Sequence, residues 1–391
     1  MITSAPSLNP QVEQVYPIVN SLFKQMTGLQ GIEAVDTNSL VAMGSLINNL
    51  GKNDLYLNSL ARRIGRTITD YRTYSTLYLD LARSNIEWGA IVQKIHAEMP
   101  EATDCKIYEV GFLDGQSVDQ WIISNPKASQ KLFDKETPYS FFITISTKML
   151  KDAFLSAETM QHFISTIFLQ VQNKISVVME ELGRLCVNNF ILNVENRQHL
   201  HLVSMYNAEV PGANLTSASC IHDADFLRYT IGIINMMSKK LEDMSVLYNK
   251  ESRQKFTPKK YQRLYLLSDF MERIKTVVSY AAFHKDDITA RPNITIPFFQ
   301  SNSLINAPTY FEDITTISGS VEGANGTSEE KTLNNVLGVM FDHDAMGTFR
   351  EEETVLTTPI NARAAYYNTF WHERPLWFND MAENGIVFFL D

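Results

Sequence analysis

The chain has 391 residues, which excludes a single small module and predicts roughly two to three domains or one large discontinuous domain. Hydrophobic residues make up 45% of the chain and charged residues 20%, which argues against disorder, collagen and coiled-coil fibre. The formal net charge is −10. Because counterion release needs clustered basic charge, we expect no tight non-specific binding of nucleic acid by the free chain.

Three cysteines, Cys105, Cys186 and Cys220, are widely spaced and form no zinc-binding pattern, so we expect a reducing compartment. The segment Met1–Pro10 lacks a basic stretch followed by an apolar one. No apolar run reaches the ~18 residues that a membrane span requires. We therefore expect neither export by a simple signal nor insertion into a membrane.

The first third of the chain predicts an arm followed by a long excursion. Residues 1–58 mix short helical patterns with a Gly- and Asn-rich stretch, and Leu60–Ile68 is typical of a strand that enters a core. Tyr71–Tyr139 interleaves aromatic and charged residues with turn signals, which indicates a two-stranded excursion. The chain then returns through Tyr139–Thr147.

The strongest helical signal begins at Ser156, a plausible N-cap, and keeps i, i+3, i+4 apolar spacing to Phe190. At 1.5 Å per residue this predicts roughly 50 Å of helix, which would lie along a sheet. Cys186 falls on its apolar face, where a small buried hydrophobe is favoured over a nucleophile.

A second helix is predicted over Asp223–Tyr248, with apolar residues on one face. Leu264–Leu267 indicates a short strand, and Ser268 can cap the helix that follows. Ser318–Ser328 contains three glycines and is predicted to be the most flexible loop.

The C-terminal region predicts mostly strands. Val336–Phe341 and Ile386–Leu390 are apolar runs typical of buried strands, and Asp344–Phe349 is predicted to form a helical turn. Ala364–Trp371 is apolar on both alternating faces, which predicts a strand buried on both sides. Helices and strands together indicate an α+β protein.

Motifs that carry chemistry are scarce. The sequence has no phosphate-binding loop, no nucleophile elbow and no His-Glu-x-x-His, so no cofactor is predicted. His199 and His201 would share a strand face, but no Asp, Glu or Cys accompanies them at ligand spacing, so ordinary histidines are favoured over a metal site.

The triplet Asp342-His343-Asp344 admits two interpretations. In one, Asp342 ends a strand and Asp344 starts a helical turn, so the carboxylates cap backbone; this is favoured. In the other, His343 acts with Asp342 or Asp344 as an acid/base pair of a hydrolase. This enzyme alternative stays open.

Four C-terminal segments resemble the major capsid proteins of tailed bacteriophages, which share the Johnson fold of the HK-ninety-seven-like family. The segments are Val339–Gly347, Thr357–Arg363, Tyr366–Trp371 and Asn384–Phe388. They are similar to the family's aspartate-bounded strand, turn, long aromatic strand and closing strand. The resemblance is closest to the heads of small short-tailed phages (podoviruses).

The resemblance implies an α+β Johnson fold with a peripheral domain, a long spine helix, an axial domain, an extended loop and an N-terminal arm. The implied divisions are 1–58 for the arm, 59–70 for the strand entering the peripheral domain, 71–139 for the extended loop, 140–222 for the peripheral domain with the spine helix, 223–333 for the axial domain, and 334–391 for the C-terminal strands returning to the peripheral domain.

The implied function is that of a head protein that self-assembles into an icosahedral shell around double-stranded DNA. Implied partners are copies of the chain in pentamers and hexamers, a separate scaffolding protein and a portal complex. The DNA would be enclosed without sequence-specific binding. The protein would be a virion component assembled in the bacterial cytoplasm, with no enzyme activity, cofactor or membrane.

A set of charged and aromatic residues is expected to contact neighbouring subunits: Arg62, Arg63, Arg66, Trp88, Asp114, Trp121 and Glu136. The three arginines could pair with carboxylates of a neighbour or within the chain, and both possibilities stay open. A second alternative keeps the fold but changes the cargo, giving an encapsulin-type compartment that holds proteins.

Overall fold

The computed structural model describes residues 20–21, 23–24, 33–34, 37–49, 76–83, 91–102, 114, 121, 123–148, 157–281, 293–300, 311–322, 327–350 and 354–391. The predicted strand Leu60–Ile68 and the predicted cap Ser156 lie outside these residues. The chain divides into two compact units, and both mix helices with strands. Unit 1 comprises Met1–Trp88, Glu136–Gly183 and Phe349–Leu376, and unit 2 comprises Gly89–Lys135, Arg184–Thr348 and Trp377–Asp391.

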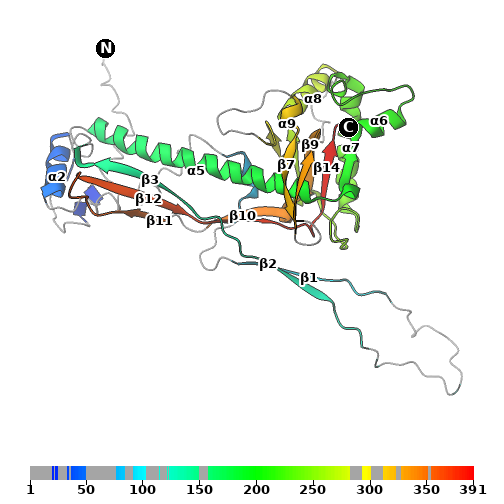
Figure 1. Cartoon of the computed structure of the whole chain (residues 1–391), viewed down its shortest axis with the longest axis horizontal. Helices are drawn as coiled ribbons and strands as arrows, with labels where there is room; N and C mark the ends of the chain where they lie inside the picture. Colours follow the sequence, from blue (N-terminus) through cyan, green and yellow to red (C-terminus); the bar gives the residue numbers. More distant parts are fainter. Residues whose placement is uncertain are drawn as a thin grey trace, which may run out of the picture. The chain divides into compact units, whose positions relative to one another are not determined.

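Unit 1 contains an antiparallel sheet with the strand order β11, β12, β3 (Figure 1). These strands span Thr354–Thr357, Tyr366–Glu373 and Tyr139–Ser146. Burial alternates along β12, where Tyr367, Thr369, Trp371 and Glu373 are buried and the residues that alternate with them are more exposed. The predicted burial on both faces is wrong. The more exposed face of the sheet carries an aromatic pair. Phe142 of β3 and Phe370 of β12 lie opposite each other, with ring centroids 5.6 Å apart.

The long predicted helix is confirmed as α5, Ala157–Asn193, which contributes residues to both units. Its part in unit 1 runs alongside the sheet (Figure 1). The 3-10 helix η1, Leu77–Leu81, approaches α5 so closely that a Cβ on Gly183 would lie 2.8 Å from the Tyr78 ring. Glycine is therefore required at this contact. Unit 1 also contains α2, Thr37–Asn49.

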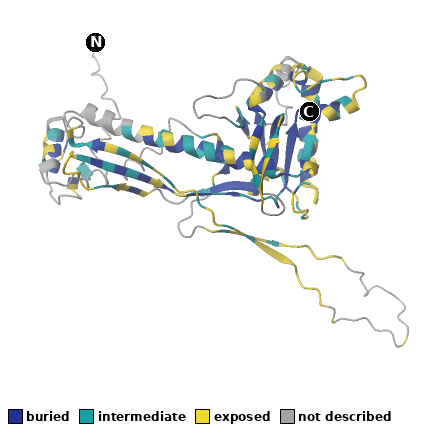
Figure 2. Ribbon diagram, in the orientation of Figure 1, coloured by how far each residue is buried: buried dark blue, intermediate teal, exposed yellow. Residues whose placement is uncertain are grey.

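Unit 2 is built on a sheet with the strand order β4, β14, β9, β5, β6. The strands span His199–His201, Gly385–Phe389, Val336–Asp342, Gln262–Leu267 and Ile294–Ile296. Every residue of β9 and β14 is buried (Figure 2). This confirms the strands predicted over Val336–Phe341 and Ile386–Leu390, and it places the core of unit 2 at these two strands.

The helices of unit 2 are α6 (Leu202–Glu209), α7 (Ala224–Glu242), α8 (Ser268–Ala281) and α9 (Phe311–Ile314), with 3-10 helices η3 (Asn196–Gln198), η4 (Cys220–His222) and η5 (Lys259–Tyr261). At the start of α7, the Asp223 carboxylate accepts a hydrogen bond from the Phe226 N–H at 2.7 Å, which is an N-cap. Within the described part of the chain, no helix is long and apolar enough to cross a membrane.

Helix α7 ends at Glu242, so the predicted extension to Tyr248 is wrong. The Thr257 N–H donates to the Leu241 carbonyl at 2.6 Å and takes up an acceptor at the helix terminus. Beyond it, Ser245 and Lys255 pair as an antiparallel bridge. Tertiary contacts therefore stop the helix before its apolar periodicity ends.

Two further predictions fail in part in the strand-rich region, and residues 323–326 of the first lie outside the described residues. Most of the predicted flexible loop Ser318–Ser328 belongs to a hairpin formed by β7, Ile317–Glu322, and β8, Ser328–Leu333. Gly319 lies in β7 close to α5, where a Cβ would lie 2.6 Å from Leu192 Cδ1 and the leucine side chain would have to shift.

The predicted helical turn Asp344–Phe349 is also wrong beyond its first residues. The 3-10 helix η6, His343–Ala345, gives way to strand β10, Met346–Arg350. That strand pairs with β13, Pro375–Asn379, and strand pairing overrides the local helical signal.

Candidate functional site

The long excursion contains an antiparallel hairpin, which confirms its predicted two-stranded character. Strand β1, Val92–Ala97, pairs with β2, Ala128–Phe133, and both belong to unit 2. Burial alternates along β1, because neighbouring side chains point to opposite faces of a strand. The hairpin therefore has two faces of different chemistry. One face is partly buried, and the other is exposed.

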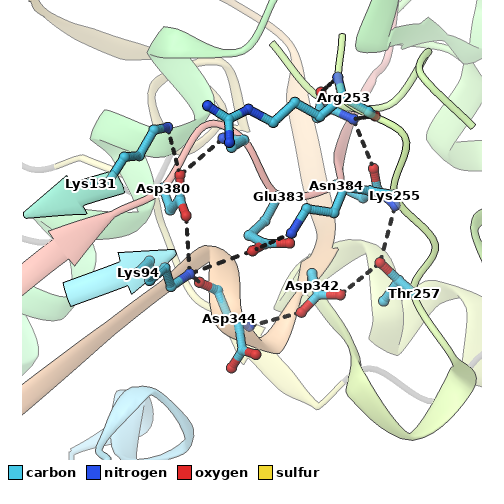
Figure 3. Close-up of polar contacts among 12 residues, drawn as sticks. Lys94, Lys131, Arg253, Lys255, Thr257, Asp342, Asp344, Asp380, Glu383 and Asn384 are labelled. Carbon is cyan, nitrogen blue, oxygen red and sulfur yellow. Dashed lines mark hydrogen bonds and ion pairs between the residues drawn. The ribbon is translucent and has the colours of Figure 1, made fainter. Parts of the chain in front are cut away.

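Lys94 and Lys131 face each other directly across the two strands on the partly buried face. Like charges in opposed positions destabilise a strand pair unless another group neutralises them. Asp380 lies between them: its Oδ2 is 3.1 Å from Lys94 Nζ and its Oδ1 is 2.9 Å from Lys131 Nζ (Figure 3). One carboxylate thus bridges both strands to the loop that follows β13.

Two more carboxylates complete this cluster. Glu383 is 3.6 Å from Lys94 Nζ, and Glu251 forms an ion pair with Lys131. We call the five residues Lys94, Lys131, Asp380, Glu383 and Glu251 the hairpin root. The root comes from strands and loops far apart in sequence, since Lys94 and Asp380 are 286 positions apart.

Asp380 is the most enclosed member of the hairpin root, with a side chain 3% exposed. Burial by itself would raise the pKa of this carboxyl, but Lys94 and Lys131 outweigh it and hold the pKa below its usual value. The Ala382 N–H also donates to Oδ1 at 3.1 Å, and the Asp380 N–H donates to the Ala345 carbonyl at 2.6 Å. Asp380 is therefore fixed in place and ionised.

Apolar contact at the hairpin root is limited. The Phe133 and Phe378 rings lie 5.3 Å apart, and Lys94 Nζ lies 5.5 Å from the centre of the Phe378 ring. His96 shares the face of Lys94, and burial together with the nearby Arg253 and Lys255 lowers its pKa. The contacts described between the hairpin and the rest of unit 2 are thus largely ionic.

The opposite face of the hairpin carries no charge on its strand positions. The register places Gln93, Ile95 and Ala97 opposite Leu132, Gln130 and Ala128. Ile95 is 71% exposed and Leu132 56%. We call these six residues the outer face of the hairpin. Exposed apolar side chains gathered on one face are typical of an interaction surface.

The triplet Asp342-His343-Asp344 lies beside the hairpin root, and the predicted capping role is confirmed for Asp342, whereas Asp344 Oδ1 lies 3.3 Å from His343 Nδ1. Asp342 Oδ1 accepts from the Asp344 N–H at 2.9 Å, and Oδ2 accepts from the Thr257 hydroxyl at 2.7 Å (Figure 3). Burial raises the pKa of Asp342.

A hollow of about 470 Å³ lies in unit 2 away from the triplet, and its lining includes Arg197, Lys250 and Lys331.

The two strand histidines and the helix cysteine lie in unit 2. His199 and His201 share a strand face as predicted, and burial, as the largest cause, lowers the pKa of His199 to about 4. Cys186 is buried, which raises its thiol pKa to about 12 and fits the predicted inert role. Among the described residues no group of three His, Cys, Asp or Glu could hold a metal ion.

Of the residues expected at subunit contacts, Arg62, Arg63, Arg66 and Trp88 lie outside the described residues. Asp114 is exposed in a turn, and Trp121 is 82% exposed. Glu136 forms an ion pair with Arg374 of the same chain at 2.6 Å, and the contact role of all these residues stays a prediction. Of the three described ones, Glu136 belongs to unit 1, whereas Asp114 and Trp121 belong to unit 2.

Sequence reasoning missed the hairpin root. Alternation along β1 was the available signal, because it places Lys94 and His96 on one face of a strand. The acceptor Asp380 could not be assigned from spacing, since no local pattern links it to Lys94.

A family model of the Phi29-like phage major capsid protein matches residues 17–389. The chain belongs to this family. It is therefore a head shell protein and a component of the virion. A comparison with curated proteins finds no match.

Solved structures agree with the capsid fold. A chain in the structure of the head fiber and inner core protein of native bacteriophage P68 matches with a TM-score of 0.53 at 9% identity, covering 81% of this chain and 85% of that one. Chains of the capsid structures of Staphylococcus phage Andhra and Cyanophage P-SCSP1u match with TM-scores of 0.49 and 0.46. Their identities are 11% and 10%, and they cover 80% and 81% of this chain and 83% and 88% of those chains. The capsid protein has the Johnson fold.

Proposed function

We propose that copies of this capsid protein form a closed icosahedral shell of pentamers and hexamers around double-stranded DNA. The family match across residues 17–389 carries the proposal. The net charge of −10 supports it, because an acidic lining would repel the packaged phosphates and let DNA slide without sequence-specific binding. The encapsulin-type alternative lacks such support.

Within that shell, residues 71–139 act as the extended loop that overlaps a neighbouring copy. The outer face of the hairpin supports this role, because six uncharged residues on two paired strands offer a surface that a second copy can cover. Loops of this length in a compact chain usually pair with something. The predicted contacts Asp114 and Trp121 lie in the same segment.

The domain roles follow the resemblance. Helix α5 serves as the spine helix within residues 140–222, residues 223–333 form the axial domain, and residues 334–391 return strands to the peripheral domain. A separate scaffolding protein and a portal complex are the proposed external partners. Assembly takes place in the bacterial cytoplasm.

The proposed function requires no catalysis. The Asp342 carboxylate accepts from the Asp344 N–H and from the Thr257 hydroxyl, which supports a structural role for Asp342. The Asp344 carboxylate lies 3.3 Å from His343 Nδ1 and is 63% exposed. The variant His343→Ala is expected to assemble like the unchanged protein, as judged by electron microscopy. A hydrolytic turnover that disappears in this variant would overturn the non-enzymatic assignment.

The proposed function is tested by negative-stain electron microscopy and sedimentation of the purified full chain, alone and with the candidate scaffolding protein of its genome. Closed shells or ring-shaped capsomers are the expected result. A chain that stays monomeric and folded under both conditions would overturn the shell proposal. The deletion of 105–126 should leave a folded subunit that forms no closed shell.

A further inference from the structure

The geometry points to Asp380 as the positioning residue that fixes the direction of the β1–β2 hairpin relative to its unit. The inference rests on the proposed role of that hairpin in contacting a neighbouring copy. A loop that must reach a second subunit needs a defined direction, because a contact repeated by symmetry tolerates little angular error. The hairpin root is where that direction is set.

The electrostatics of the strand pair depend on Asp380. Lys94 and Lys131 are opposed across the strands, so in isolation their charges would weaken the hairpin at this position. Asp380 contacts both ammonium groups, at 3.1 Å and 2.9 Å. Its negative charge offsets the repulsion between the two lysines and links them through one carboxylate. The same carboxylate therefore closes the strand pair and attaches it to unit 2.

The carboxylate is also rigidly held. Asp380 makes three hydrogen bonds with backbone groups: its N–H donates to the Ala345 carbonyl, its carbonyl accepts from the Glu383 N–H, and its Oδ1 accepts from the Ala382 N–H. Its side chain is almost completely buried. A buried carboxylate with a fixed position orients its partners better than an exposed one, because little side-chain freedom remains. The lysines are about one quarter exposed, so they are the movable half of the bridge.

The pairing of Asp380 differs from that of its neighbours in the hairpin root. Glu383 also contacts Lys255 at 3.0 Å, and Glu251 also contacts Arg253 at 2.6 Å. Each glutamate would therefore keep a cationic partner if one hairpin lysine were lost. Among the carboxylates of the root, Asp380 alone is paired with both Lys94 and Lys131, so it alone links the two opposed lysines.

This arrangement predicts an asymmetry between partners. Asp380→Asn keeps the side-chain shape and its acceptor oxygen but leaves two opposed lysines with less neutralising charge. Lys131→Met removes one of those charges, while Asp380 keeps Lys94 and Glu251 keeps Arg253. If each ion pair instead contributed the same stability, the two variants would increase hydrogen exchange of the hairpin equally, because each removes two ion pairs.

The test is hydrogen exchange of the full chain, followed in peptides that cover Val92–Ala97 and Ala128–Phe133. Asp380→Asn is expected to speed exchange there by roughly tenfold, whereas Lys131→Met leaves it within about twofold. The double variant Asp380→Asn with Lys131→Met should return towards the unchanged rate. Lys127→Met is the matched control, because its pair with Glu98 lies on the hairpin itself and is 80% and 60% exposed.

Equal exchange in Asp380→Asn and the unchanged chain would overturn the inference, as would additive loosening in the double variant. Peptides of α7 serve as the folding control. If Asp380→Asn misfolds, Lys131→Met and the double variant still decide the question, because the inference requires the double variant to fold better than Asp380→Asn. Electron microscopy of the same samples is independent: absence of shells from the unchanged chain contradicts the proposed function, not the exchange result.

Discussion

Unit 2 contains two antiparallel hairpins that are attached by different forces. Hairpin β7–β8 begins at Ile317, which is fully buried, and it continues into the buried strand β9. Hairpin β1–β2 is attached mainly through the ion pairs of its root. Apolar attachment depends little on pH or salt, whereas ionic attachment depends on both. One hairpin is therefore fixed, and the attachment of the other can be adjusted by solution conditions.

The largest effect is expected at the apolar attachment. Ile317→Ala should lower the free energy of unfolding by about 2–5 kcal/mol, because it removes buried methyl groups and leaves a cavity. Urea denaturation measures this loss, and the loss should be the same at low and high salt. A strong salt dependence would contradict the apolar assignment of β7–β8.

The next effect is the acid response of the hairpin root. The pKa of Asp380 is lowered in the folded chain, so its contribution is present in full above the unfolded pKa of about 4 and is lost as pH falls through the folded value. His96 lies on the same face as Lys94. Its protonation adds positive charge there, so it also lowers the stability of the hairpin root as the pH falls. Asp342 responds oppositely, because burial raises its pKa.

Comparing the unchanged chain with Asp380→Asn isolates the share of Asp380 in this response. Exchange of the β1–β2 peptides should differ between the two proteins at neutral pH, and the difference should narrow below about pH 4. A difference that grows on acidification would contradict the assigned sign.

Salt gives a smaller effect that sharpens the same contrast. Raising ionic strength from 0.1 M to 1 M shortens the screening length from about 10 Å to about 3 Å. Exchange of the β1–β2 peptides should increase by a few fold, while the β7–β8 peptides should change little. An equal increase of exchange with salt in both hairpins would contradict the ionic attachment of β1–β2 and the apolar attachment of β7–β8.

The smallest effect is expected at a polar contact between hairpin β7–β8 and helix α5. Lys331 Nζ donates to the Leu192 carbonyl at 2.8 Å, in the last turn of α5. Lys331→Met should lower the free energy of unfolding by about 0.5–1.5 kcal/mol, the usual net value of one such hydrogen bond. Chemical denaturation checks this, with Ile317→Ala as the reference for a large loss.

Much of the fold could be predicted because its signals are local. The apolar spacing of α5 and the Asp342 cap each depend on residues within a few positions of one another. The errors occur where distant segments decide the outcome. Gly319 indicates flexibility by itself, but it belongs to strand β7 and pairs with Lys331 of β8.

The candidate site was less predictable than the fold. The expected contact residues were chosen by type and position, and the structure places Glu136 in an ion pair with Arg374 of the same chain. The hairpin root consists of ordinary lysines and carboxylates without a motif. Such residues gain a role only when folding brings them within about 4 Å of each other.

The sequence by itself determined the α+β class, the long helix, the buried strands β9 and β14 and the resemblance that family membership bears out, because periodicity and local order are written along the chain. Only the tertiary structure decided that Lys94 and Lys131 share Asp380, and that one hairpin is attached by charge and the other by burial. The reason is physical: a long-range ion pair depends on where two backbones meet, and the spacing of charges along a chain does not encode that meeting point.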